Sequence, residues 1–294
     1  MEKQISLGMM RINNLSIEEL ENLINEALNQ NITLFDHANI YGNNKCEELF
    51  GEVLKRNKDL RKRMVIQSKC GICNGYYDSS KEHIIDETLK SIKRLNCDYL
   101  DILLIHRPDA LIDYKEVNEA FNYLYENGYV KEFGVSNMNP YQMELFKKYV
   151  KQPIKYNQVQ FSIVHSNMVQ EGLFVNMNEK EALPTSQGIL EYCYLNDIKV
   201  QAWSSLMASW SEGTFIDNPN YPKLNNKLEE LANKYKVSKN TIAIAWILRL
   251  PQNIIPIIGT TSINRVKEMS KAINITLTRK EWYELYLSVG HNLP

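Results

Sequence analysis

The stretch YLDILLIH, residues 99–106, decides the fold of this chain. It is a nearly continuous apolar run of strand length, and such a run is typical of a strand whose two faces are both buried in a parallel sheet. A strand with one solvated face would instead alternate apolar and polar side chains. The run therefore predicts that the chain contains a buried parallel sheet.

Segments of strand and helix character alternate on both sides of this run, with short connections between them. We expect strands over 5–12, 32–38, 64–69, 99–106, 130–136, 154–160, 199–204 and 254–258. We expect helices over 16–29, 46–56, 83–95, 115–127, 139–149, 186–196, 224–235, 238–250, 262–272 and from 278 onward. Ser16 with Glu19, and Thr278 with Glu281, form capping boxes at two helix starts. Pro256 makes the last strand the weakest assignment, because proline removes a donor from the ladder.

Eight strands, each followed by a helix, favour a (β/α)8 barrel that spans residues 1–294 as a single domain. The alternative is an open doubly wound sheet. A dinucleotide-binding sheet of that kind would carry GxGxxG after its first strand, whereas this chain offers only SLGMMR, 6–11. The longest irregular stretches, 70–82, 161–185 and 207–223, all follow strands, so we expect them on the carboxyl face where a barrel builds its pocket.

The composition sets limits on the kind of partner. The chain has 294 residues, a hydrophobic content of 44% and a formal net charge of −1. A protein that binds nucleic acid would favour a basic face, so no nucleic-acid partner is expected. The longest apolar run, TIAIAWIL at 241–248, is too short to cross a membrane. No hydrophobic signal region is evident at the start, and a soluble, cytoplasmic protein is expected.

The five cysteines do not form a disulfide framework, and reduced thiols are expected. Cys70 and Cys73 form a CxxC motif, which could be a redox pair, half of a zinc site, or two unrelated thiols. Because no second CxxC or HxxxH completes a metal site, we favour the unrelated thiols and expect no metal.

Four ionisable residues stand at or just after the ends of successive predicted strands: Asp36, Tyr41, Lys69 and His106. Each alone would be an ordinary polar residue of a barrel rim. The carboxyl ends of successive parallel strands face one cleft, so the four side chains together can meet there. Their joint placement predicts an active site.

These residue types can deliver a proton to a carbonyl oxygen that receives a hydride. A free tyrosine has a pKa of about 10, and we expect the Lys69 ammonium to lower that value for Tyr41. Asp36 would keep the buried lysine charged. His106 could donate a hydrogen bond to the carbonyl oxygen and orient the substrate.

In this light the chain resembles the aldo-keto reductases almost from end to end. The landmarks are LGMMR, FDHANIYG, VIQSKCG, LDILLIHRPD, KEFGVSN, YNQVQF, VQAWSSL and IPIIGTTSINRVKE, in this order. The stretch LLIHRPDALIDYKEV most resembles a bacterial, short-looped branch of oxidoreductases. The resemblance implies a (β/α)8 barrel that moves a hydride between a nicotinamide dinucleotide and a carbonyl or alcohol without metal. The family's Asp, Tyr, Lys and His tetrad falls on Asp36, Tyr41, Lys69 and His106.

The remaining strand ends fit a nicotinamide cofactor under this resemblance. Amide and hydroxyl groups for the carboxamide come from Ser136, Asn137 and Gln158, and Trp203 offers a flat surface for the ring. Backbone amides of Ser204, Ser205 and Leu206 could hold the pyrophosphate, and Gly259, Thr260, Thr261 and Ser262 lead into a helix start that suits an anion.

Arg265 could clamp a 2′-phosphate, so we favour NADP(H). The family pattern often has a lysine where Gly259 stands and an amide residue where Met269 stands, and NAD(H) therefore stays an alternative.

We expect Met9, Met10, His106 and Trp210 to line the substrate pocket, together with residues 70–78. The expected reaction is reduction of a small aldehyde or ketone to an alcohol, with Tyr41 as proton donor, in a monomeric protein. Two rival functions are a non-catalytic NADPH-sensing barrel and a lyase in which Lys69 forms a Schiff base.

Overall fold

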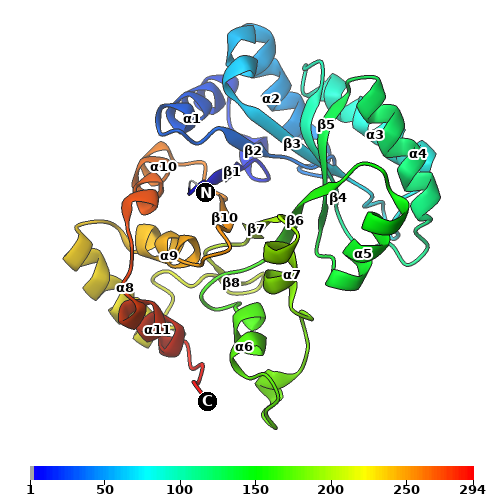
Figure 1. Ribbon diagram of the computed structural model, residues 1–294. Helices are drawn as coiled ribbons and strands as arrows, with labels where there is room; N and C mark the ends of the chain where they lie inside the picture. Colours follow the sequence, from blue (N-terminus) through cyan, green and yellow to red (C-terminus); the bar gives the residue numbers. More distant parts are fainter. Residues whose placement is uncertain (1–2) are drawn as a thin grey trace. The chain divides into compact units, whose positions relative to one another are not determined.

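The computed structural model describes residues 3–294 (Figure 1). Eight parallel strands close into a barrel in the order β1, β2, β3, β4, β5, β6, β7, β10, which confirms the predicted fold class. The barrel strands are β1 (Ser6–Gly8), β2 (Leu34–Asp36), β3 (Val65–Cys70), β4 (Leu100–Ile105), β5 (Val130–Ser136), β6 (Ile154–Gln160), β7 (Lys199–Trp203) and β10 (Ile255–Ile258).

The helices lie close to the predicted ranges. They are α1 (Ile17–Asn29), α2 (Lys45–Arg56), α3 (Lys81–Arg94), α4 (Tyr114–Glu126), α5 (Pro140–Tyr149), α6 (Asn167–Leu173), α7 (Ile189–Leu195), α8 (Pro222–Tyr235), α9 (Lys239–Leu248), α10 (Ile263–Ser270) and α11 (Arg279–Ser288). Short 3-10 helices are η1 (Ile12–Asn14), η2 (Lys58–Arg63), η3 (Lys180–Ala182) and η4 (Lys271–Asn274). Both capping boxes, at Ser16 and Thr278, are confirmed.

Four stretches differ from the sequence-based expectation, and one of them is β2, which covers only Leu34–Asp36 of the predicted 32–38. The first strand covers only Ser6–Gly8 of the predicted 5–12, because the chain then turns into η1. The region predicted as irregular over 161–185 contains α6 and η3, and the region 207–223 contains the antiparallel strands β8 (Met207–Ser209) and β9 (Gly213–Thr214). Pro256 is accommodated in β10, where it pairs with Ala202 of β7.

The described chain packs as two compact units. The N-terminal unit holds Ser6–Gln158 and Gly259–Ile263, and the C-terminal unit holds Val159–Ile258, Asn264–Pro294 and the chain up to Ile5. The predicted domain span of 1–294 includes two residues outside the described part and stays a prediction.

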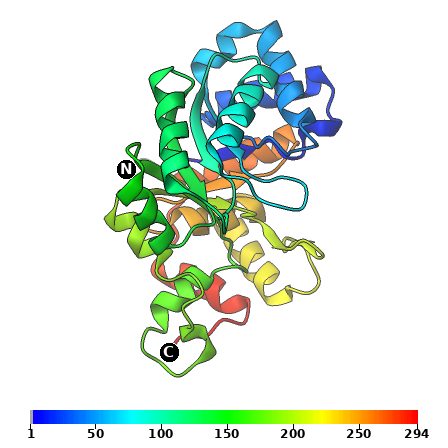
Figure 2. The same ribbon diagram turned by 90° about the vertical axis from the view of Figure 1, so that its right-hand side faces the viewer.

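Within the N-terminal unit, β4 confirms the pattern that predicted a buried sheet. All its residues except Asp101 are buried. Asp101 forms an ion pair with Arg61, whose Nη2 lies 2.8 Å from Asp101 Oδ2. Helices α3 and α4 lie side by side, and Lys81 at the start of α3 pairs with Glu119 of α4 at 2.7 Å (Figure 2). The register of β3 on β4 places Lys69 opposite Leu104, so the carboxyl ends of these two strands lie at the same edge of the sheet.

The C-terminal unit is organised around α9, which is buried along its whole apolar stretch from Thr241 to Leu248. Trp246 of α9 stacks on Trp282 of α11 with ring centroids 4.7 Å apart, and each indole N–H donates to the other residue's carbonyl at 3.0 Å. The end of the chain lies beside α6 in both ribbon views (Figures 1 and 2), where Ser166 Oγ and His291 Nε2 are 2.9 Å apart.

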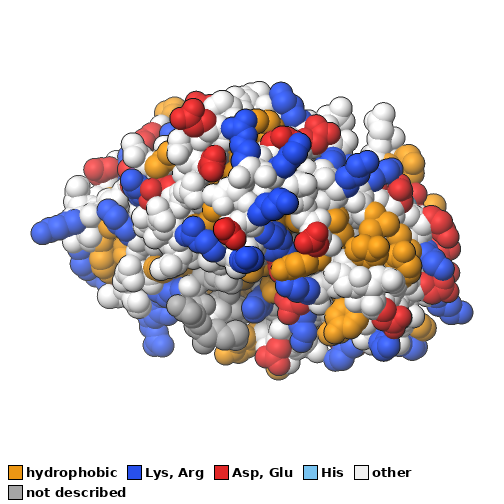
Figure 3. Space-filling view, turned by 90° about the horizontal axis from the view of Figure 1, so that it is seen from above, with side chains coloured by type: hydrophobic (Ala, Val, Ile, Leu, Met, Phe, Trp, Pro, Cys, Tyr) orange, Lys and Arg blue, Asp and Glu red, His pale blue; other side chains and the backbone are white. Residues whose placement is uncertain are grey.

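The surface face drawn in Figure 3 carries acidic and basic side chains mixed together. This mixture agrees with a formal net charge of −1. Among residues 3–294, no helix is both long and apolar enough to cross a membrane.

Candidate active site

The carboxyl ends of β2 and β3 bring Asp36, Tyr41 and Lys69 into direct contact. The sheet pairing of β2 with β3 continues past Asp36, because His37 N donates to Gln67 O at 2.8 Å and Asn39 N donates to Lys69 O at 3.1 Å. A turn at residues 38–41 then folds the tyrosine back over the end of β3. Two strands and one turn therefore place three of the four predicted residues.

Lys69 is the centre of the cluster and is fully buried. Its Nζ lies 2.8 Å from Asp36 Oδ1, 3.0 Å from Tyr41 Oη and 2.7 Å from the His37 carbonyl. Burial alone would lower the pKa of Lys69, but the Asp36 carboxylate and the Tyr41 hydroxyl raise it above its ordinary value. The lysine is therefore charged in the core of the unit.

Asp36 is held by two glutamine side chains. Gln67 Nε2 donates to Asp36 Oδ1 at 2.5 Å, and Gln158 Nε2 donates to the same oxygen at 2.9 Å. Gln67 was missed from the sequence, although it lies two residues before Lys69 and hence on the same face of β3. Gln158 was predicted as a cofactor ligand, and in the structure its amide nitrogen orients the carboxylate.

Tyr41 is half-buried, and its pKa is raised above the ordinary value. Burial is the largest cause and raises the pKa, the Lys69 ammonium lowers it, and the Asp36 carboxylate raises it again. Lys69 lowers the pKa of Tyr41, as expected, but desolvation of the phenolate outweighs this effect, so the pKa lies above its ordinary value. Tyr41 is therefore a protonated phenol at neutral pH.

His106 follows β4 and is anchored by its backbone N–H, which donates to Cys70 O at 2.8 Å. Its ring centroid lies 6.1 Å from that of Tyr41, edge to face. Burial, Lys69 and Arg107 hold the pKa of His106 well below its usual value, so the imidazole is neutral. Its buried Nδ1 has no hydrogen-bond partner within residues 3–294. The ring nevertheless faces Tyr41, as the predicted site requires.

Ser136 and Asn137 end β5 in the same unit. Asn137 has a positive φ of 59°, and its Nδ2 donates to Ser136 Oγ at 2.7 Å. Ser136 Oγ in turn donates to the Gln158 carbonyl at 2.9 Å. This chain of hydrogen bonds fixes the amide and hydroxyl groups that we predicted for a carboxamide.

The segment Gly259–Ile263 follows β10 and belongs to the N-terminal unit. Arg11 donates to the Gly259 carbonyl at 3.3 Å, and Ser262 N donates to Thr260 Oγ1 at 3.1 Å. A Cβ placed on Gly259 would meet nothing within 4 Å, so the backbone here borders open space. An approachable backbone that leads into a helix fits the phosphate cradle we expected of Gly259, Thr260 and Thr261.

The other predicted cofactor residues belong to the C-terminal unit. Trp203 ends β7 and is half-buried, and Ser204 has a positive φ of 57°. Ser205 Oγ donates to Ala202 O at 2.9 Å, so its hydroxyl supports the turn after β7. Leu206 and the exposed Arg265 complete the set. Their roles in cofactor binding stay predictions.

The predicted pocket residues differ in exposure. Met9 is fully buried in the N-terminal unit, whereas 36% of Met10 is exposed. Met10 is therefore better suited than Met9 to line a pocket. In the C-terminal unit, Trp210 stands between β8 and β9 with 68% of its surface exposed.

None of the five thiols is in a disulfide, and residues 3–294 contain no group of three or more His, Cys, Asp and Glu side chains placed to hold a metal ion. Cys70 is buried, and burial raises its pKa to about 12. Cys73 is half-buried.

A closed parallel barrel with an ionisable cluster at its carboxyl strand ends belongs to the class of barrel enzymes. The family follows from residues 4–286, which match the model of the aldo/keto reductase family. The chain therefore belongs to this family of oxidoreductases.

Relatives support this assignment. The chain is 34% identical to the oxidoreductase YdhF of Escherichia coli, over 96% of this chain and 91% of that protein. It is 31% identical to a 6-dehydroglucose reductase of Agrobacterium fabrum, over 98% of this chain and 94% of that protein.

Solved structures show the same fold. A thermostable aldo-keto reductase in complex with the inhibitor epalrestat is 26% identical, with a TM-score of 0.76 over 97% of this chain and 94% of that chain. An aldo-keto reductase of Klebsiella pneumoniae in complex with NADPH has the same TM-score at 20% identity, over 97% of this chain and 94% of that chain.

Proposed function

We propose that this protein is an NADPH-dependent reductase that converts an aldehyde or ketone to an alcohol, with Tyr41 as the proton donor. One observation carries the proposal: the fully buried Lys69 ammonium lies 3.0 Å from the Tyr41 hydroxyl and 2.8 Å from the Asp36 carboxylate. A buried lysine held charged beside a phenol is suited to supporting the negative charge that develops when the phenol gives up its proton.

The residues divide the chemistry among themselves. Bound NADPH would supply the hydride. Tyr41 gives its proton to the carbonyl oxygen, and Lys69 stabilises the charge left on the phenolate. Asp36, held by Gln67 and Gln158, keeps Lys69 charged. The neutral His106 donates an N–H to the substrate oxygen and so fixes its position.

The cofactor proposal rests on the residues that we expect to hold it. Ser136 and Asn137 offer fixed polar groups at the end of β5, and the open backbone at Gly259 precedes a helix start. Arg265, three residues after Ser262, is the cation proposed for the 2′-phosphate, which makes NADPH the preferred form over NADH.

A relative named 6-dehydroglucose reductase directs the choice of substrates. We propose a small polar or aromatic carbonyl compound as the substrate class, and oxidised sugars belong in the first panel. The raised pKa of Lys69 and its ion pair disfavour a Schiff-base lyase, because an ammonium is not a nucleophile.

The test is steady-state NADPH oxidation with a panel of aldehydes, ketones and oxidised sugars, with NADH in parallel. Tyr41→Phe should abolish turnover and retain NADPH binding, since the variant lacks only the hydroxyl that carries the transferable proton. Tyr123→Phe, which alters an exposed tyrosine of α4, serves as the matched control and should keep full activity.

A fully active Tyr41→Phe protein would refute the proposed proton donor. Tight NADPH binding without turnover on any carbonyl would favour the non-catalytic sensing barrel instead.

A further inference from the structure

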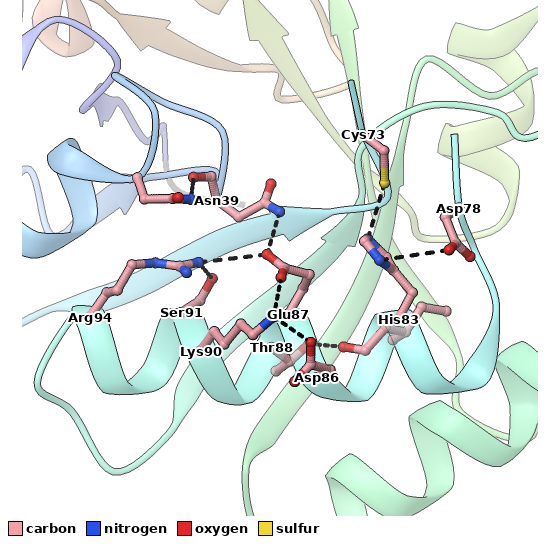
Figure 4. Close-up of polar contacts among 12 residues, drawn as sticks. Asn39, Cys73, Asp78, His83, Asp86, Glu87, Thr88, Lys90, Ser91 and Arg94 are labelled. Atoms are coloured by element: carbon pink, nitrogen blue, oxygen red, sulfur yellow. Dashed lines mark hydrogen bonds and ion pairs between the residues drawn. The ribbon is translucent and has the colours of Figure 1, made fainter. Parts of the chain in front are cut away.

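A cysteine with histidine and carboxylate partners lies outside the tetrad, in the loop between β3 and α3 (Figure 4). Cys73 Sγ is 3.8 Å from Nε2 of His83, and Nδ1 of the same ring is 3.8 Å from Oδ2 of Asp78. The imidazole thus stands between the thiol and the carboxylate, with one ring nitrogen toward each. In this order a carboxylate orients a histidine, and the histidine accepts the proton of a nucleophilic thiol.

The backbone of the loop holds the thiol and the carboxylate in place. Cys73 N donates to Tyr76 O at 3.0 Å, Asp78 N donates to Gly71 O at 3.0 Å, and residues 72 and 77 form an antiparallel bridge. Residues 71–78 are therefore a closed hairpin and not a free loop.

The histidine and the carboxylate are fixed by the start of α3. Ser80 N donates to Asp78 Oδ1 at 2.9 Å, which leaves Oδ2 for the imidazole. His83 lies three residues after the N-cap Ser80, whose side chain accepts from His83 N. The N-cap of α3 and the Cys73–His83 pair are thus parts of one local structure.

Exposure separates Cys73 and Cys97 from the other three thiols. Cys46, Cys70 and Cys193 are buried, whereas Cys73 and Cys97 are half-buried. Cys97 Sγ points to the Ile92 carbonyl at 3.8 Å, and burial raises its pKa to about 12. Cys97 is therefore a second half-buried thiol in a different setting, and it provides an internal comparison.

The charges around Cys73 disfavour a free thiolate. Burial raises the pKa of Cys73, a hydrogen bond with the Tyr76 side chain lowers it, and the carboxylates of Asp78, Glu87 and Asp109 raise it. A thiolate beside these carboxylates is disfavoured, so the sulfur reacts more readily when a base removes its proton during the attack. The thiol therefore keeps its proton at rest and passes it to the imidazole as the sulfur attacks.

We propose that Cys73 is a covalent modification site for α,β-unsaturated carbonyl compounds, with His83 as its acid–base partner and Asp78 as a positioning residue. His83 Nε2 takes the S–H proton while the sulfur forms a bond to the β-carbon. The π electrons of the C=C bond move to the α-carbon and carbonyl oxygen as an enolate, and His83 returns the proton to the α-carbon. The product is a saturated thioether, so no oxidant is consumed and no cofactor is needed.

The experiment measures alkylation of the folded chain by acrylamide, an α,β-unsaturated amide, without any nicotinamide. Peptide mass spectrometry of timed samples gives the rates at Cys73 and Cys97 in the same tube. Cys73 should react about tenfold faster than Cys97, a modest factor for general base assistance because the S···N distance is long.

His83→Gln should reduce the Cys73 rate by about tenfold at neutral pH and leave the Cys97 rate unchanged, which also reports that the variant is folded. Asp78→Asn keeps a side-chain oxygen that can accept from Ser80 N. It should reduce the Cys73 rate less than His83→Gln does. His165→Gln, a half-buried loop histidine in the other unit, should change neither rate.

Equal rates at Cys73 and Cys97, or an unchanged ratio of these rates in both His83→Gln and Asp78→Asn, would overturn the proposal. The experiment uses no NADPH and measures no turnover. Its outcome therefore does not depend on whether the protein is a reductase.

Discussion

Lys69 is a full charge in the interior, and Asp36 makes this possible. Taking a lone ammonium out of water is costly, and the carboxylate offsets that cost only while Gln67 and Gln158 satisfy its other lone pairs. The same ion pair that stabilises the fold thus keeps the proposed proton donor beside a cation.

Asp36→Asn tests this coupling. Removing one partner of a buried pair should lower the free energy of unfolding by about 3 kcal/mol at neutral pH, as measured by urea denaturation. In the native protein the pKa of Lys69 is raised, so its contribution is complete at neutral pH and is lost only as pH rises through that alkaline value. In the variant, burial governs the lysine, so the destabilisation should be smaller at alkaline pH than at neutral pH.

The exposed pair of Lys62 and Asp59, with side chains 82% and 87% exposed, is the matched control. Asp59→Asn should leave the unfolding curve unchanged, since solvent screens such pairs. An Asp36→Asn protein as stable as this control would show that the buried pair is not needed to hold Lys69.

The proposed proton donor, Tyr41, should set the pH profile of the reaction. Its pKa is raised, so the phenol stays protonated through neutral and mildly alkaline pH, and His106 stays neutral over the same range. The kcat of carbonyl reduction should therefore be flat there and fall only when Tyr41 loses its proton. The kcat of alcohol oxidation, which needs the phenolate, should rise with pH; a reduction rate that falls across the neutral range would contradict this assignment.

At the scale of the element, α2 packs on the end of α3 at a glycine. A Cβ on Gly51 would lie 2.0 Å from the Arg94 carbonyl, and Arg94 is fixed there by its ion pair with the buried Glu47 at 2.7 Å. This network continues along α3 through Glu87 to Asn39, which follows β2 (Figure 4). The position of α2 thus depends on a backbone contact that has no room for a side chain.

Gly51→Ala should therefore destabilise the protein by about 2 kcal/mol in thermal or urea unfolding. Helix propensity alone predicts the opposite sign, a gain of about 1 kcal/mol, so the direction of the change separates the two effects. Gly259→Ala adds a Cβ that meets nothing within 4 Å and should leave stability nearly unchanged. A more stable Gly51→Ala protein would show that the helices separate easily at this point.

At the scale of the whole molecule, binding of the cofactor should raise the free energy of unfolding. A cofactor at one hundred times its Kd adds about 2.7 kcal/mol to the free energy of unfolding. NADPH should raise the Tm more than NADH does at equal concentration, if Arg265 holds the 2′-phosphate. Arg265→Ala should reduce the Tm shift with NADPH and leave the shift with NADH unchanged.

Arg279→Ala, at another exposed arginine, is the control and should leave both shifts unchanged. Equal losses with the two cofactors in Arg265→Ala would contradict a role for this arginine in choosing between them.

The sequence by itself determined the barrel and the composition of the tetrad. Strand and helix periodicities are local properties, and strands such as β5 and β6 begin and end where the pattern predicts. Parallel strands end at one face, so Asp36, Tyr41 and Lys69 could be placed together before any distance was known. The short α6 and the β8–β9 hairpin were missed, because elements of this length carry too few turns or pairs for a periodic signal.

Only the tertiary structure decided how the site is supported and charged. Gln158 reaches Asp36 across 122 positions of the chain, and Cys73 meets His83 because a hairpin and a helix cap bring them together. The raised pKa of Tyr41 also depends on burial, which no local pattern specifies. Hydrogen bonds between remote residues and the exclusion of water arise from packing in three dimensions. They set the pKa values and the orientations of side chains whose identities the sequence had already supplied.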